Sequence, residues 1–70
     1  MERKRVSSGT LRSVGYDERS QTLEIEFSSG SVVQYARVSP EVHRRLMAAP
    51  AMASFFRDCI EEAFTPRRLR

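Results

Sequence analysis

The 70 residues leave room for one small core, and the sequence accommodates neither a deep catalytic cleft nor a membrane-spanning helix of about 20 apolar residues. The formal net charge of +3 comes from the two ends of the chain. Residues 1–5 carry +2 and residues 65–70 carry +3, whereas residues 6–64 hold six arginines against eight carboxylates, which is −2.

We therefore expect a single domain over residues 1–70, with a folded core at about 6–64 and basic tails at 1–5 and 65–70. Basic tails can attract phosphate groups, although charged ends are also common as simple solvated termini. No apolar segment follows the first charges, so a secretory signal is not expected. The single cysteine fits a reducing compartment, and we expect a cytoplasmic protein.

The stretch 22–27 gives the clearest strand pattern. Its odd-numbered residues are apolar and its even-numbered residues are polar, as in a strand with one buried and one solvated face. Gly30 fits a tight hairpin turn, because glycine adopts the positive φ that such turns need. Residues 32–38 follow as the partner strand, in which simple alternation places Val38 on the face opposite Tyr35.

A first strand is expected at residues 10–16, preceded by a lead-in loop at 6–9. Its alternation is imperfect, and a register change between Leu11 and Val14 would bring both side chains to one face. Asp17 starts the following turn, because its carboxylate can accept a hydrogen bond from the amide two residues on.

Two helices follow the strands. Ser39 can cap the first helix, Pro40 suits its first position and Pro50 ends it. The second helix is predicted over residues 52–64, where apolar side chains recur at i, i+3 and i+4, and Pro66 ends it. The predicted fold class is α+β: a three-stranded antiparallel meander followed by two helices packed on one face, in the order β-β-β-α-α.

The apolar positions of these elements predict the core. Its members are Leu11, Val14, Leu23, Ile25, Phe27, Val42, Leu46, Phe55, Phe56, Cys59, Ile60 and Phe64, with Tyr16 and Tyr35 partly buried. Because Cys59 belongs to the apolar stripe of the second helix, we expect a buried thiol rather than an exposed nucleophile.

No constellation of residues points to an enzyme. One histidine and one cysteine cannot make a convergent metal site, and the three glycines are too scattered for a phosphate-binding loop. Glu24 and Glu26 share one side of a strand, a spacing found in acid–base pairs, but an open sheet face has no wall to desolvate either carboxylate. We interpret them as a solvated face that discourages aggregation and that is too acidic for a nucleic-acid platform. The sequence predicts a non-enzymatic protein without a cofactor, a membrane partner or an evident small-molecule substrate.

Arginines near aromatic residues are typical of proteins that bind single-stranded RNA, because bases stack on rings and phosphates pair with guanidinium groups. Tyr16 and Tyr35 could add stacking surface, although tyrosines of a small sheet commonly pack beneath its helices. On the first helix, Arg44 points away from the apolar stripe. The candidate nucleic-acid-binding residues are Arg12, Arg37, His43, Arg44, Arg45, Arg67 and Arg68.

An ordered set of residues runs through about residues 6–64: Val14-Gly15-Tyr16-Asp17, Leu23-x-Ile25-x-Phe27-x-x-Gly30, Val32-x-x-Tyr35-x-x-Val38, Leu46-Met47-x-Ala49, Phe55-Phe56 and Ile60. This set resembles the KTSC domain, a family named for the C-terminus of some lysyl-tRNA synthetases and also found as small stand-alone bacterial proteins. The resemblance implies a nucleic-acid-binding role through the synthetase context, and it transfers no catalytic residues.

Some positions depart from the family pattern. Aromatic residues are expected where Val33 and His43 stand, and Ser-x-Gly is expected where the second helix opens with Ala51 and Ala53. Arg57 replaces a frequent asparagine and Glu61 a frequent basic residue. If the polar residues of the second helix form a binding surface in the family, this chain has lost much of it.

The sequence is compatible with two functions. The first is a small binding module for nucleic acid, with RNA as the expected partner. The alternative is a protein-interaction or self-association module that uses a sheet edge or the wet sheet face. If the arginines of the sheet and the first helix converge with a tail in the fold, RNA binding is favoured. If they are scattered among carboxylates, the interaction module is favoured.

Overall fold

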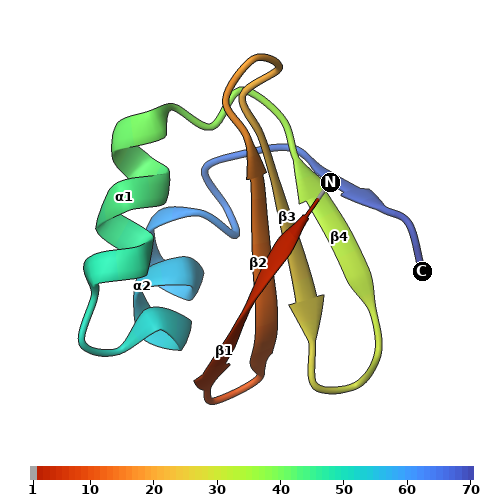
Figure 1. The fold of residues 1–70 in the computed structure, drawn as a ribbon, viewed down its shortest axis with the longest axis vertical. Helices are drawn as coiled ribbons and strands as arrows, with labels where there is room; N and C mark the ends of the chain where they lie inside the picture. The colour runs from red at the N-terminus through yellow and green to blue at the C-terminus, as the bar shows by residue number, and fades with distance from the viewer. Residues whose placement is uncertain (1) are drawn as a thin grey trace.

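The computed structural model, which describes residues 2–70, contains a five-stranded sheet and two helices (Figure 1). The elements are β1 (Arg3–Ser8), β2 (Leu11–Asp17), β3 (Thr22–Phe27), β4 (Val32–Tyr35), α1 (Pro40–Ala48), α2 (Met52–Cys59) and β5 (Pro66–Arg68). The strands pair antiparallel in the order β1-β2-β3-β4-β5, and both helices lie on one side of the sheet (Figure 1). The predicted α+β fold of two helices and an antiparallel sheet is confirmed, whereas the prediction of only three strands is wrong.

The two additional strands come from the ends of the chain, where the sequence pattern indicates a loop and basic tails. β1 pairs with β2, so residues 6–8 are strand rather than lead-in loop. At the other edge, β5 pairs with β4, and Val32 and Arg70 extend the pairing with a hydrogen bond of 2.8 Å from the Val32 amide to the Arg70 carbonyl. These pairings satisfy backbone groups that a three-stranded sheet would leave open along β2 and β4.

The irregularity of β2 has the predicted cause. The register between β2 and β3 shifts between Leu11 and Ser13, and both Leu11 and Val14 are buried in the core. After the strand, the Asp17 carboxylate accepts a hydrogen bond of 3.0 Å from the Arg19 amide, as predicted for this turn.

The core lies between the sheet and the helices, with Phe56 of α2 at its centre. The Phe56 ring meets the rings of Phe27 and Tyr35 edge to face, with centroids 5.6 and 5.5 Å apart. The fully buried cluster is Leu11, Val14, Leu23, Ile25, Tyr35, Val38, Leu46, Phe56 and Ile60. Of the other predicted core residues, Phe27, Val42, Phe55 and Phe64 are only partly buried.

Two predictions about the core are wrong. Val38 is fully buried because Arg37 has a left-handed backbone, with φ of 62°, which interrupts the alternation after β4 and turns Val38 inward. Cys59 is exposed because α2 ends there instead of continuing to residue 64. The amides of Ile60 and Glu61 both bond to the Phe56 carbonyl, each at 2.9 Å, and the chain then turns toward β5.

The helix starts differ in their caps. Ser39 caps α1 as predicted, since its hydroxyl accepts a bond of 3.3 Å from the Val42 amide. Ala51 gives α2 no side-chain cap. The Ser8 hydroxyl at the end of β1 instead accepts a bond of 3.3 Å from the Ala53 amide. Gly9, with φ of 57°, lets the β1–β2 turn lie close to α2, because a Cβ there would lie only 3.0 Å from the Ala53 Cβ.

Candidate nucleic-acid interface

The face of the sheet turned away from the helices, here called the free face, is defined by the strand register. Residues directly opposite each other in antiparallel strands share a face. One row across all five strands is Arg3, Gly15, Glu24, Gln34 and Arg67, and the next row is Arg5, Ser13, Glu26 and Val32. The arginine-rich ends of the chain therefore flank both glutamates of β3.

Glu24 is held by side chains from the strands on either side. Its Oε2 lies 2.7 Å from Arg3 Nη1, and its Oε1 accepts a hydrogen bond of 3.0 Å from Gln34 Nε2. Only 7% of the residue is exposed. The interpretation of Glu24 as a solvated residue is therefore wrong, because β1 and β4 supply side chains that cover it and satisfy both of its oxygens.

Glu26 is bound in a similar way at the other end of β3. The Ser13 hydroxyl donates a bond of 2.8 Å to its Oε1, while Arg70 Nη2 and Arg12 Nη1 lie 3.5 and 3.9 Å from its Oε2. The pKa of Glu26 is lowered, first by the Ser13 hydrogen bond and further by Arg3, Arg12 and Arg70, while burial opposes the shift. Glu26 therefore stays ionised in the fold and orients the surrounding guanidinium groups.

The free face is basic, contrary to the interpretation that its two glutamates make it acidic. Five arginines surround the two glutamates, and with Asp17, which the register places on the same face, the net charge of these residues is +2. We call the five arginines the free-face arginines; they are Arg3, Arg5, Arg12, Arg67 and Arg70. The side chains of Arg12 and Arg70 remain 50% and 66% exposed, so their ion pairs leave surface open to a ligand.

A shallow hollow marks the centre of this basic group. It has a volume of about 620 Å³, and Arg3, Arg5 and Arg12 line it together with Ser13 and Glu26. Three guanidinium groups within one hollow can bind the oxygens of a phosphate, because each presents several N–H donors in a planar fork.

The candidate residues of α1 lie on the other side of the sheet. His43 stacks on Tyr16 with ring centroids 4.5 Å apart and an interplanar angle of 8°. Burial lowers the pKa of His43, so its imidazole is neutral near pH 7. Arg44 is exposed, and Arg45 pairs with Glu41 one turn earlier at 2.7 Å. Such an exposed i,i+4 pair contributes about 0.3–0.5 kcal/mol.

The seven candidate residues therefore do not form one surface. Arg12 and Arg67 belong to the free face, whereas His43, Arg44 and Arg45 belong to α1. Arg37 lies at the bend after β4. Arg68 lies opposite Val33 and contacts the Ser31 hydroxyl at 3.5 Å, on the helix side of β5.

Three arginines of the free face, Arg3, Arg5 and Arg70, are absent from the candidate set. Their place depends on pairing with distant strands, which a local pattern does not reveal. One available signal is the spacing of Arg3 and Arg5, which puts both on one side of any extended segment.

Between residues 2 and 70, no group of three or more histidine, cysteine or acidic side chains could hold a metal ion. No helix in this range is long and apolar enough to cross a membrane.

A small antiparallel sheet covered on one side by two helices is also the architecture of a solved KTSC domain protein from Yersinia pestis. The two structures superpose with a TM-score of 0.95 at 33% sequence identity, covering 99% of this chain and 97% of that chain. The family model of the KTSC domain matches residues 7–64. The chain belongs to the KTSC domain family, as its sequence motifs indicate.

The sequence is similar to those of two kinds of relatives. An uncharacterized protein of Stutzerimonas stutzeri is 40% identical over 70 residues, which is 100% of this chain and 93% of that protein. A lysine–tRNA ligase of Nostoc punctiforme is 39% identical over 54 residues, which is 77% of this chain and 10% of the ligase. The matching sequence thus covers 93% of the first relative and 10% of the second.

Proposed function

We propose that this protein binds RNA, and that the free-face arginines contact the phosphate backbone. The observation that carries the proposal is the pairing of both chain ends as edge strands, which gathers arginines of three separate segments on one side of the sheet. A net positive surface attracts a polyanion and releases its counterions on binding. The similarity to part of a lysine–tRNA ligase adds support, because that relative is named for a tRNA substrate.

The expected mode of binding is independent of base sequence. The register rows of the free face contain no aromatic residue on which a base could stack. Guanidinium groups on an open surface instead contact phosphate oxygens, which are the same in every sequence.

Titration of an unmodified tRNA transcript at low and at physiological salt tests this proposal. We expect binding at low salt that weakens steeply as salt is added, since each phosphate contact contributes a slope of about 0.7–0.9 in log affinity against log salt. The absence of binding at low salt would overturn the proposal.

A matched pair of double variants locates the interface. Arg5→Ala with Arg12→Ala removes two charges from the free face, and Arg44→Ala with Arg45→Ala removes two charges from α1. We expect the first variant to lose affinity and to reduce the salt slope by about one for each phosphate contact removed, and the second to change less. Equal losses would show that overall charge, and not the free face, controls binding.

A second candidate function has a specific observation in its favour. The sheet is open at both edges, where β1 and β5 each pair on one side only. Such edges can add a strand from a protein partner or from a second copy of the chain. Sedimentation at several protein concentrations would reveal self-association. A concentration-dependent dimer without RNA binding would favour this function over the first.

A further inference from the structure

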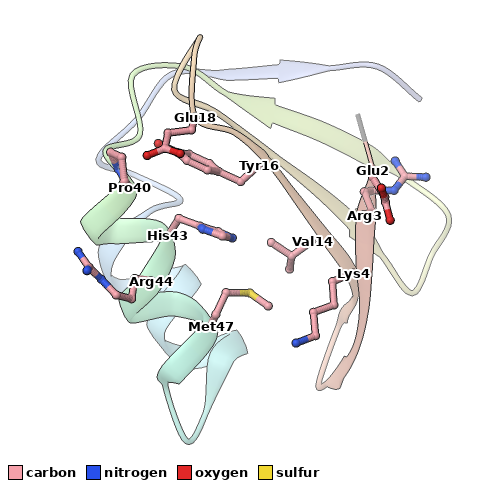
Figure 2. Close-up of a pocket in the computed structure, with 10 residues that line it drawn as sticks. All are labelled: Glu2, Arg3, Lys4, Val14, Tyr16, Glu18, Pro40, His43, Arg44 and Met47. Atoms are coloured by element: carbon pink, nitrogen blue, oxygen red, sulfur yellow. The ribbon is translucent and has the colours of Figure 1, made fainter.

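A cleft of about 830 Å³ lies between α1 and the β1–β2 edge of the sheet (Figure 2). α1 contributes His43 and Met47, β2 contributes Val14 and Tyr16, and β1 contributes Lys4, which lies opposite Val14. This volume lies within the roughly 300–1,000 Å³ that is usual for small-molecule sites.

The interior of the cleft is mainly apolar and has a firm aromatic wall. Figure 2 shows the side chains of His43 and Met47 projecting from α1 toward Val14. Tyr16 is fixed by a hydrogen bond from its hydroxyl to the Val38 carbonyl and by its parallel stack with His43. A flat apolar group can therefore lie between this wall and the flexible thioether of Met47.

Charged and polar residues also line this cleft. The His43 imidazole is neutral near pH 7 because burial lowers its pKa, so it offers one hydrogen-bond donor and one acceptor. Lys4 supplies a positive charge from the strand side, and Figure 2 shows Arg44 pointing away from the cleft. Glu2, Arg3 and Glu18 complete the lining, and the two carboxylates can accept hydrogen bonds from amino groups.

β1 connects the cleft to the free face. Its residues alternate, so that Arg3 and Arg5 belong to the free face while Lys4 faces the cleft. A polyanion that passes over this edge strand meets positive charge on both sides of it. The cleft opens next to that path and combines a flat apolar wall with hydrogen-bonding groups, which suits a heterocyclic base better than a phosphate.

We propose that the cleft holds one unpaired nucleobase of a bound RNA, while the flanking phosphates lie on Lys4 and Arg5. This inference rests on the proposed RNA binding and adds a base-binding subsite to it. It predicts a preference for single-stranded or looped RNA over a continuous duplex, because only an unstacked base can enter the cleft.

Nuclear magnetic resonance of protein labelled at the methionine methyl groups and the histidine ring tests the base site directly. We expect AMP, CMP and GMP to shift the signals of the Met47 methyl group and the His43 ring, and ribose 5-phosphate to leave them unchanged. Met52 serves as the internal control, because it lies outside the cleft. Equal shifts with ribose 5-phosphate would show a phosphate site and overturn the inference.

A pair of RNA oligonucleotides separates base binding from backbone binding. One is a single-stranded octamer, and the other has the same phosphates but lacks the central base. We expect the intact octamer to bind about 5- to 100-fold more tightly, which is the usual effect of one stacked base. Met47→Phe, which replaces the flexible thioether with a rigid ring and narrows the cleft at the base site, should reduce this difference and leave the affinity for the abasic octamer unchanged.

The outcomes distinguish this inference from the proposed function. If both octamers bind the natural protein equally well and with a steep salt dependence, the base site is refuted and backbone binding stands. If neither binds at low salt, both proposals fail. Thermal unfolding of Met47→Phe establishes that this variant is folded, and the methionine titration requires no variant.

Discussion

Phe56 links α2 to the sheet through its contacts with the rings of Phe27 and Tyr35. Replacing Phe56 with alanine removes these contacts and leaves a cavity at the centre of the core. We expect Phe56→Ala to lower the free energy of unfolding by about 3–5 kcal/mol, which is a large part of the stability of so small a protein. Urea denaturation measures the loss.

Arg57→Ala on the exposed side of the same helix is the matched control, and it should change stability by less than about 0.5 kcal/mol. A loss of under about 1 kcal/mol for Phe56→Ala would mean that α2 contributes little to the core.

Protonation of His43 makes the free energy of unfolding depend on pH. Its folded pKa is lowered by burial against Tyr16, so the unfolded chain takes up the proton more readily. The stabilisation that the neutral imidazole gives to the fold is fully present above the unfolded pKa of about 6.5. It declines as the pH falls from there toward the lowered folded pKa.

His43→Phe keeps an aromatic stack and removes the titrating group. We expect the natural protein to lose stability between about pH 7 and pH 5 relative to this variant. Urea denaturation at several pH values gives the comparison. A stability difference between the two proteins that is the same at every pH would rule out this role for His43.

The contact between the β1–β2 turn and α2 shows how the start of a helix is stabilised by a residue distant in the sequence. The Ser8 hydroxyl accepts a hydrogen bond from the Ala53 amide, whereas the side chain of Ala51 has no acceptor. We expect Ser8→Ala to cost about 1 kcal/mol in unfolding free energy, the usual effect of losing a helix cap. Ser7→Ala, on the exposed neighbouring residue, is the control and should be close to neutral. Similar losses in both variants would argue against the cap.

The elements that the sequence predicts well have local causes. Alternation in residues 22–27 and the Ser39-Pro40 start of α1 depend on neighbours in the chain. β1 and β5 do not show such patterns, because edge strands are covered on one side at most and carry many charges. In β1, Val6 is the only apolar residue.

Local sequence patterns likewise reveal only part of the free face. Arg12 and Arg67 are among the residues that the sequence singles out, and both lie on the free face. Arg3 and Arg5 acquire their position only by pairing with Gly15 and Ser13. A local pattern cannot show this, since the pairing depends on which strand β2 accepts as its neighbour.

The first and last strands of the chain, β1 and β5, form the two edges of the sheet. β5 is short and exposed, and the Val32 amide depends on the Arg70 carbonyl for its hydrogen bond. We expect the Val32 amide to be protected from hydrogen exchange in the full chain and to exchange rapidly after deletion of residues 66–70. The Ile25 amide in the central β3 should remain protected in both proteins, and loss of protection there would mean that the deletion unfolds the whole sheet.

The return of β5 to β4 also bears on the order of folding. Each of the first four strands pairs with the next strand in the chain. Both helices separate β4 from β5 in the sequence, so Pro66 reaches Tyr35 across a much longer stretch of chain. Closing this longer loop costs more entropy, so β5 is expected to join after the rate-limiting step. Substitutions in β5 should then accelerate unfolding and leave the refolding rate nearly unchanged. The arginines that complete the free face would be the last part of it to assemble and the first to detach.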